Sequence, residues 1–521
     1  MNRDAVVLPA SLRPERLDQL RAAVRGTGAP EPVILPFTGE PFTELAQSTE
    51  ADLDLAADRA RTAQREWAAV DVGERAAIGI RLHDLIIDRG EELVDVIQAE
   101  TGKARNHAYL EVLEVALLAR FLGRVAASTL RTRALPGAVP FLTRVRQRPA
   151  PVGLFGLISP WNYPLSLGVG DGLAALFAGN ALLHRPDGRT VLTAALGREL
   201  IIEAGLPADL WQLVTGPGDR IGPALIDRVD HLQFTGSTAT GRSVAEQAGR
   251  RLISASLELG GKNPMIICAD ANLSRAVPGA VAACFASAGQ LCESIERIYV
   301  HRAVAEAFTR RFTAVTDRLR VGVGFGDDYD IGSLTSAEQL TKISDHVADA
   351  VAHGATVLAG GRPVPEVGPY CYRPTVLTDL PPTARCFAEE TFGPVVAITA
   401  VESDEEAIRL ANDSPYGLNA SIWTADLARG RRIASRLQVG KININDGFAA
   451  AYGSVQAAIS PWRDSGSGRR HGREALLAVT RSQTVAVQSI LPTGEFGPFR
   501  GRAYRRLMAA ALRVMKHLPN R

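Results

Sequence analysis

Three polar side chains, Asn162, Glu258 and Cys292, are of types that carry out nucleophilic chemistry on a carbonyl group. Cys292 lies in SAGQLCESIER, and the segment after it is expected to be helical, so its thiol could lie at a helix N-terminus that favours the thiolate. Glu258 lies in SLELGGK, where burial between two leucines would raise the pKa of the carboxyl towards that of a general base. Asn162 lies in SPWNYP, where the prolines hold an amide that could donate to a developing oxyanion.

Each of these residues also has a purely structural interpretation. A cysteine at this spacing is more often a buried core residue, and a glutamate at a strand end is more often a surface group. An asparagine between prolines is common in turns. Taken one at a time, the structural interpretation is favoured, so the three residues predict chemistry only in combination with other features.

Two glycine-containing segments could hold a phosphate. FTGSTATG (234–241) follows an expected strand and opens an expected helix, a setting in which backbone N–H groups can bind a pyrophosphate. It lacks the lysine of a P-loop and does not match the GxGxxG fingerprint, and TGPGDRIG (215–222) also misses that fingerprint. Either segment alone is a weak indication of a nucleotide site.

The order and spacing of these segments change the interpretation. Glu258 precedes Cys292 by 34 residues, with the glycine turn and the rigid asparagine before both. From about residue 150 to 475 the chain contains SPWNYP, AGNALLHRP, FTGSTATG, LELGGKNP, GQLCESIER, EETFGPV, NDSPYGLNASIW and SGSGRRHG. On these segments, the chain resembles the NAD(P)-dependent aldehyde dehydrogenase superfamily.

The resemblance implies a role for each of the three polar residues. Cys292 would be the nucleophile, Glu258 the general base, and Asn162 an oxyanion donor beside the backbone N–H of Cys292. The thiolate would attack the aldehyde to give a thiohemiacetal, and a hydride would pass to the nicotinamide. Glu258 would then activate the water that hydrolyses the thioester to an acid. No metal is implied.

The resemblance also implies a cofactor site. In it, Ser237 contacts the pyrophosphate, Trp161 lines the crevice, and Glu390 and Phe392 hold the nicotinamide ribose and ring. The full expected set is Trp161, Arg185, Asp187, Gly188, Gly236, Ser237, Leu259, Glu390 and Phe392.

The choice between NAD and NADP depends on residues 185–188, where the superfamily usually has Lys-Pro-Ser-Glu. The usual glutamate repels a 2′-phosphate, and Gly188 removes that repulsion. Arg185 can form a bidentate contact with a phosphate, whereas Asp187 acts in the opposite direction. NADP is therefore the favoured cofactor, with NAD as the alternative.

The nearest subgroup by overall similarity is the actinobacterial type 2 succinate-semialdehyde dehydrogenases that use NADP, so succinate semialdehyde is the expected substrate. Typical succinate-semialdehyde dehydrogenases bind the substrate carboxylate with two arginines, and those positions here hold Gly170 and Ala286. Arg463 is a candidate replacement, in an altered loop (460–466) that has gained Trp462. Without such an anchor, a neutral aliphatic or aromatic aldehyde is the alternative substrate.

Two other functions are weaker alternatives. A CoA-acylating relative needs its thioester to survive until CoA arrives, and Glu258 argues against that function. A non-catalytic scaffold derived from a dehydrogenase is disfavoured because Cys292, Glu258 and Asn162 are all present.

An α/β fold would position these residues. Helical and strand-like segments alternate almost throughout the chain, a pattern that predicts parallel sheets. The resemblance implies a Rossmann-like cofactor domain, a catalytic α/β domain and a β oligomerisation arm. The expected divisions are the cofactor domain (1–130 and 153–259), the arm (131–152 and 478–495), the catalytic domain (260–447), a return to the cofactor domain with a substrate-mouth loop (448–477) and a basic tail (496–521).

Composition limits the partners and the location. The 521 residues carry 58 basic and 56 acidic side chains, so the net charge of +2 provides no field that attracts nucleic acid. Five cysteines without CxxC spacing favour a reducing compartment. The N-terminus has no apolar signal segment, so we expect a cytoplasmic protein with no clear membrane association, acting on a small-molecule aldehyde.

The arm and the tail are expected to contact other molecules. Exposed strand edges in the arm predict a homodimer or homotetramer, because unpaired edges promote aggregation. Arg500 to Arg521 contains seven basic residues and no acidic one. Packing of this tail on its own or a neighbouring subunit is favoured, with a membrane surface or another partner as the alternative. The expected apolar face of the tail comprises Tyr504, Leu507, Met508, Ala511, Leu512, Met515 and Leu518.

Overall fold

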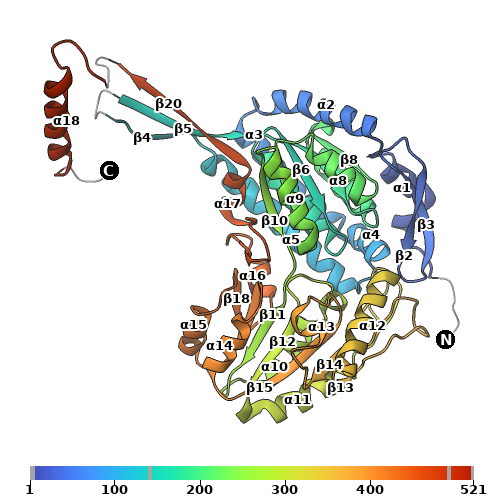
Figure 1. Cartoon of the computed structure of the whole chain (residues 1–521). Helices are drawn as coiled ribbons and strands as arrows, with labels where there is room; N and C mark the ends of the chain where they lie inside the picture. Colours follow the sequence, from blue (N-terminus) through green and yellow to red (C-terminus); the bar gives the residue numbers. More distant parts are fainter. Residues whose placement is uncertain (1–5, 139–142, 490–493, 518–521) are drawn as a thin grey trace.

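The computed structural model describes residues 6–138, 143–489 and 494–517. Its two large sheets lie in two lobes, and a narrow arm extends from the first lobe (Figure 1). The chain passes from the first sheet to the second at 259–262, directly after Glu258.

The first sheet has six parallel strands in the order β1-β8-β7-β6-β9-β10. Strand β6 has the sequence LFGLIS and is buried at every position, as expected for a strand covered on both faces. The strand order reverses between β6 and β9, the point at which open parallel sheets bind ligands beyond their carboxyl ends. The strands are β1 (Val24–Arg25), β6 (Leu154–Ser159), β7 (Ala181–Pro186), β8 (Trp211–Val214), β9 (His231–Thr235) and β10 (Ser254–Glu258).

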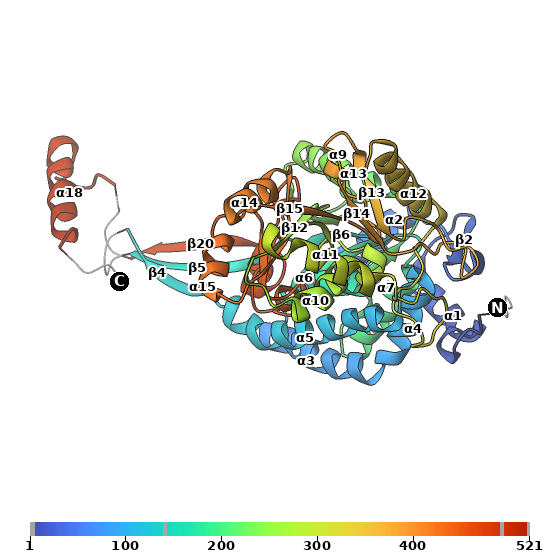
Figure 2. The ribbon, with the colours of Figure 1, turned by 90° about the horizontal axis from the view of Figure 1, so that it is seen from below.

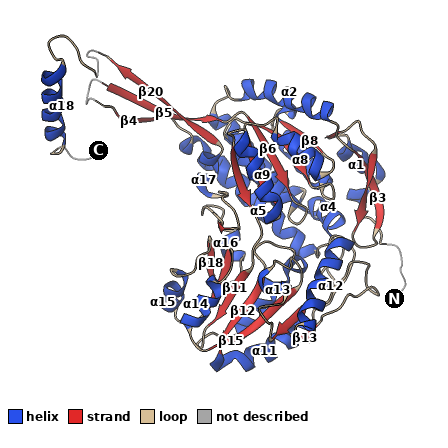
Figure 3. Ribbon diagram, viewed as in Figure 1, coloured by secondary structure: helices blue, strands red, loops and turns tan. Residues whose placement is uncertain are grey.

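Helices pack around the first sheet (Figure 3). Residues 50–129 fold into four helices, and Thr49 starts the first of them through a capping box with Asp52. The helices of this lobe are α1 (Pro14–Arg21), α2 (Glu50–Trp67), α3 (Val72–Asp88), α4 (Gly90–Thr101), α5 (Arg105–Thr129), α6 (Asp171–Phe177), α7 (Val191–Glu203), α8 (Gly218–Ile226) and α9 (Thr238–Arg250). A hairpin of β2 (Pro30–Leu35) and β3 (Glu40–Ala46) lies beside them.

The second sheet has seven strands in the order β13-β14-β15-β12-β11-β17-β18, and only the edge pair β13 and β14 is antiparallel. The strands are β11 (Asn263–Ile267), β12 (Ile295–His301), β13 (Thr356–Ala359), β14 (Thr375–Thr378), β15 (Val395–Val401), β17 (Asn419–Trp423) and β18 (Lys441–Ile444). The helices of this lobe are α10 (Leu273–Phe285), α11 (Arg302–Thr316), α12 (Ala337–Ala352), α13 (Arg385–Ala388), α14 (Asp404–Asn412), α15 (Leu427–Ala434) and α16 (Ala449–Tyr452). A short pair, β16 (Tyr416–Gly417) and β19 (Trp462–Arg463), completes it.

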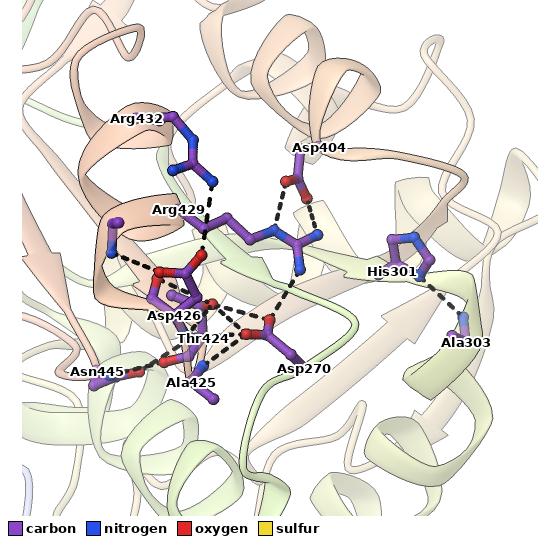
Figure 4. Close-up of polar contacts among 11 residues, drawn as sticks. Asp270, His301, Ala303, Asp404, Thr424, Ala425, Asp426, Arg429, Arg432 and Asn445 are labelled. Carbon is purple, nitrogen blue, oxygen red and sulfur yellow. Dashed lines mark hydrogen bonds and ion pairs between the residues drawn. The ribbon is translucent and has the colours of Figure 1, made fainter.

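A polar cluster ties the carboxyl end of the second sheet together (Figure 4). The Asp270 carboxylate accepts a hydrogen bond from Thr424 at 2.8 Å and bonds from two backbone N–H groups after β17. Arg429 bridges Asp270 at 3.0 Å and Asp404 at 2.6 Å. The cluster therefore fixes the starts of α14 and α15, at the opposite end of the strands from Cys292.

The arm is a three-stranded antiparallel sheet in which β5 (Thr143–Pro151) lies between β4 (Arg133–Pro136) and β20 (Thr480–Gln488). Helix α17 (Gly472–Ala478) leads into β20, and α18 (Gly501–Met515) lies beyond the arm (Figure 2). No helix within the described ranges is long and apolar enough to cross a membrane. Residues 139–142 and 490–493 of the expected arm, and Leu518 of the expected apolar face, lie outside the described residues.

Candidate active site

The strand-order reversal of the first sheet brings two predicted segments together. Trp161 and Asn162 follow β6, and Gly236 and Ser237 follow β9. All four line a cavity of about 170 Å³, which Cys292 also lines from the second lobe. The candidate site therefore lies where the carboxyl ends of the first sheet face the second lobe.

Cys292 lies in a turn between a short 3-10 segment (Ala286–Gly289) and strand β12. The helix predicted after Cys292 is therefore wrong, and no helix N-terminus lies there to favour the thiolate. Burial raises the pKa of the Cys292 thiol to about 12, Glu293 adds to this effect, and Lys441 opposes it. The thiol of the ligand-free protein is thus protonated at neutral pH, so it needs a base to become a nucleophile.

A backbone constraint places the Cys292 turn. Ser287 and Ala288 have positive φ angles of 52° and 54°, in the left-handed region that non-glycine residues avoid. Gly289, at φ 68°, has no room for a side chain, because a Cβ there would lie 2.1 Å from the Gly393 carbonyl oxygen. Close contact with the Gly393 segment therefore fixes the backbone just before Cys292.

Asn162 is buried, with 4% of its surface exposed. Its side-chain Nδ2 donates to the Gln290 carbonyl at 3.0 Å, two residues before Cys292. Its own carbonyl accepts a hydrogen bond from Lys103 Nζ at 2.6 Å, and Lys103 forms an ion pair with Glu111 at 2.7 Å. These contacts hold the Asn162 amide beside the cysteine turn and leave one amide hydrogen for another acceptor.

Glu258 ends strand β10 and is 6% exposed, so it is not the surface glutamate of the structural interpretation. Its Oε1 has no hydrogen-bond partner among the described residues. Burial raises the pKa of Glu258 to about 8, and Arg470 opposes that rise. The Gly468 backbone crosses this carboxylate so closely that a Cβ on Gly468 would lie 2.3 Å from Oε1.

Buried ion pairs around Glu258 and Asn162 were not singled out from the sequence. Arg470 pairs with Asp171 at 2.6 Å, and His471 Nε2 shares a hydrogen bond with Glu114 at 2.7 Å. Lysine scarcity was an available signal, because three of the five lysines in the chain are buried in ion pairs. Those pairs are Lys103–Glu111, Lys262–Glu296 and Lys441–Glu293.

The predicted cofactor residues divide between two cavities. Trp161, Gly236, Ser237, Leu259, Glu390 and Phe392 line the cavity that contains Cys292. Arg185, Asp187 and Gly188 line a second cavity of about 530 Å³, because they lie at the carboxyl end of the neighbouring strand β7. Arg189 connects the two groups, since its guanidinium lies 5.9 Å from the Trp161 ring while its residue lines the second cavity.

Contacts around Cys292 hold several of these residues in place. Glu390 accepts a hydrogen bond from the Gly261 N–H at 2.7 Å, and burial raises the pKa of Glu390 to about 7. Glu296, the partner of Lys262, accepts from the Phe392 N–H at 3.0 Å. The Phe392 and Trp161 rings meet edge to face at 5.5 Å. Ser237 caps α9 by accepting from the Thr240 N–H at 3.2 Å.

The residues of both cavities fit an anionic dinucleotide. Arg185 donates to the Gly216 carbonyl at 2.9 Å, while its buried Nε has no partner among the described residues. No atom lies within 4 Å of a Cβ placed on Gly188, so this position is open. A buried, unsatisfied guanidinium N–H beside open space suits a phosphate.

An apolar cluster packs against Cys292. Cys292 packs against a buried cluster of Tyr163, Leu167, Ala286, Leu291, Phe448 and Tyr452. Of the positions that lack the expected arginines, Ala286 belongs to this cluster, and Gly170 faces Val115 and Leu118 of α5. The prediction that Arg463 anchors the substrate carboxylate is wrong for this cavity, which Arg463 does not line. Its exposed guanidinium donates instead to the Asn412 and Ser414 carbonyls.

Comparisons with known proteins agree with this geometry. The sequence profile of the aldehyde dehydrogenase family matches residues 24–485. A Mycolicibacterium smegmatis protein named "Putative succinate-semialdehyde dehydrogenase", with NADP(+) in its name, is 46% identical over 490 residues, or 94% of this chain and 95% of that one. A crystal structure titled "Putative Aldehyde Dehydrogenase" from Burkholderia cenocepacia has a TM-score of 0.84 at 34% identity and covers 90% of this chain and 96% of that one. Betaine aldehyde dehydrogenase from Staphylococcus aureus in complex with NAD+ has a TM-score of 0.85 at 28% identity, covering 93% and 99%.

Proposed function

The chain belongs to the aldehyde dehydrogenase family, and we propose that it oxidises succinate semialdehyde with NADP, using Cys292 as nucleophile. The α/β fold and the family predicted from the sequence are confirmed. As a member of this family, the chain is an NAD(P)-dependent aldehyde dehydrogenase that converts an aldehyde to a carboxylic acid.

The roles of three residues follow from their surroundings. The observation that carries the proposal is the meeting of Cys292 and Asn162 on one cavity, with the buried Glu258 at the adjoining strand end. The Cys292 thiol releases its proton to solvent and attacks the carbonyl carbon as the thiolate, while Glu258, whose raised pKa suits a base near neutral pH, serves the later hydrolysis step. The free Asn162 amide hydrogen stabilises the oxyanion, a contribution of about 3–4 kcal/mol per donor.

Hydrolysis completes the reaction. When bound, NADP supplies the acceptor for the hydride that leaves the former aldehyde carbon. Glu258 then takes a proton from water, and the resulting hydroxide displaces the Cys292 sulfur from the thioester to release the acid. The preference for NADP is supported by the unsatisfied Arg185 Nε and the open Gly188, while Asp187 acts against it.

A second substrate class, neutral aliphatic or aromatic aldehydes, is favoured by one observation. The cluster beside Cys292 is apolar and aromatic, and the cations Lys103, Lys441 and Arg470 are each engaged in a buried ion pair, which leaves Lys342 as the lysine that lines the cavity. Succinate semialdehyde is favoured instead by the names of the relatives. The two candidates differ in the need for a group that binds a carboxylate.

Absorbance at 340 nm distinguishes them. The purified protein is mixed with succinate semialdehyde or with a panel of neutral aldehydes, each with NADP and with NAD. We expect kcat/KM to be higher for succinate semialdehyde with NADP than for every other combination of aldehyde and cofactor. A higher kcat/KM for butanal or benzaldehyde would overturn the proposed substrate, and a higher value with NAD would overturn the proposed cofactor. The Cys292→Ala variant is the control for background reduction.

We further propose that the chain forms a homodimer or homotetramer through its arm and lies in the cytoplasm. The β20 strand has an open edge, which a second copy can cover. All five cysteines are free thiols, as expected in a reducing compartment. Light scattering on the eluted protein tests the first proposal and cell fractionation tests the second; a monomer or an exported protein would contradict them.

A further inference from the structure

The cationic and the large apolar side chains of helix α18 (Gly501–Met515) lie on separate faces of the helix. At about 100° per residue, its basic side chains fall in an arc of about 100° and its large apolar side chains in an opposing arc of about 160°. No acidic residue occurs from 500 to 517. The basic arc holds Arg502, Arg505, Arg506, Arg513 and Lys516, and the apolar arc holds Tyr504, Leu507, Met508, Leu512, Val514 and Met515.

Four of the six side chains of the apolar arc, Leu507, Leu512, Val514 and Met515, are exposed to solvent in the described chain, and Tyr504 and Met508 are half-buried. No residue of α18 is buried, and Leu512 and Val514 are 66% and 63% exposed. Helices on the two lobes carry both signs of charge, as in the Glu246–Arg250 pair on α9 and the Glu306–Arg310 pair on α11. A helix with only cationic charges and an apolar face is complemented by a surface that carries negative charges and has an apolar layer beneath them.

The boundary of an anionic lipid bilayer has both properties. We propose that α18 lies in the interface plane of an anionic membrane, with its apolar arc at the acyl boundary and its basic arc against the lipid phosphates. A second copy of this chain fits less well, because the chain carries nearly equal numbers of basic and acidic residues, 58 and 56, and its surface pairs many of them locally. The proposal depends on α18 alone and goes beyond both the proposed reaction and the expectation of no clear membrane association.

Vesicle flotation with the full-length protein tests the proposal. Vesicles are made of phosphatidylcholine alone or with an equal part of phosphatidylglycerol. We expect flotation with the phosphatidylglycerol vesicles and little with phosphatidylcholine alone, and we expect added salt to weaken it. Leu512→Glu places a charge in the apolar arc and should reduce the bound fraction about tenfold.

Leu252→Glu is the matched control, since Leu252 is 91% exposed on the first lobe and the chemical change is the same. It should leave flotation unchanged. Both variants should retain the wild-type rate of aldehyde oxidation in solution, because neither residue lines the Cys292 cavity, and that rate shows that each variant is folded.

Three outcomes would overturn the proposal. The first is no flotation of the wild-type protein with phosphatidylglycerol vesicles. The second is flotation that Leu512→Glu leaves unchanged. The third is that Leu512→Glu lowers the mass of the oligomer while the wild-type protein binds no vesicles. That result would assign the apolar arc to a contact with a second copy of the chain.

Discussion

The raised pKa of Glu258 predicts how turnover depends on pH. Burial moves the pKa of this carboxyl from 4.5 to about 8. Only the carboxylate can accept a proton from water, so thioester hydrolysis should be active above this pKa and should be lost as the pH falls through it. The ionised fraction is about one tenth at pH 7 and about nine tenths at pH 9, so the hydrolysis rate should rise about tenfold between them.

Rapid mixing separates this step from the earlier ones. The initial burst of absorbance at 340 nm reports the steps up to hydride transfer, and the later linear phase reports hydrolysis when that step is slowest. Glu258→Gln should lower the linear phase about a hundredfold and remove its pH dependence, while the burst remains.

Glu100→Gln is the matched control for this experiment. Burial also raises the pKa of Glu100 to about 8, but its carboxylate caps the start of α7 and lies outside the Cys292 cavity. With saturating cofactor, this variant should keep the pH dependence of the linear phase. A linear phase that is flat with pH, or one whose pH dependence survives in Glu258→Gln, would refute the assignment of the base.

Four further changes have defined outcomes. Cys292→Ala should abolish oxidation yet leave NADP affinity, measured by fluorescence titration, within about twofold; residual turnover would exclude Cys292 as nucleophile. Gly468→Ala puts a Cβ 2.3 Å from Glu258 Oε1 and should slow the linear phase about tenfold, whereas Gly249→Ala, with open space around it, should not. Arg185→Leu should raise the KM for NADP about tenfold and the KM for NAD less; equal increases would contradict a phosphate contact. The carboxyl of Glu258 keeps its proton to a higher pH in the folded protein than in the unfolded chain. The free energy of unfolding of the wild-type protein should therefore fall as the pH rises from 4.5 to about 8, by at most about 5 kcal/mol. Glu258→Gln should therefore raise the Tm at pH 9 more than at pH 5; an equal change at both would contradict the buried, ionised carboxylate.

The sequence alone predicted the local structure where neighbours in the chain decide it. The alternation of apolar strands with helical patterns predicted the parallel sheets, because each strand and helix face is set by nearby residues. Ser237 was expected where a strand gives way to a helix, and it caps α9 at that point. The helix expected after Cys292 is absent because the residues that follow join the second sheet as β12, and its pairing with β11 and β15 is not decided by neighbours in the chain.

Arg463 shows the same limit for a single side chain. Its residue type suggested a carboxylate anchor, but its guanidinium reaches backbone carbonyls at Asn412 and Ser414. The sequence cannot show which acceptor an arginine meets when that acceptor lies about fifty positions away.

The sequence by itself determined the family, the α/β class and the types of the candidate catalytic groups, since these depend on residue identity and order. Only the tertiary structure decided the chemical state of those groups. The pKa values of Glu258 and Cys292 depend on burial and on Arg470 and Lys441, and the position of Asn162 depends on Lys103. Those partners come from remote segments, and the low local dielectric that makes their charges matter exists only after the two lobes have packed together.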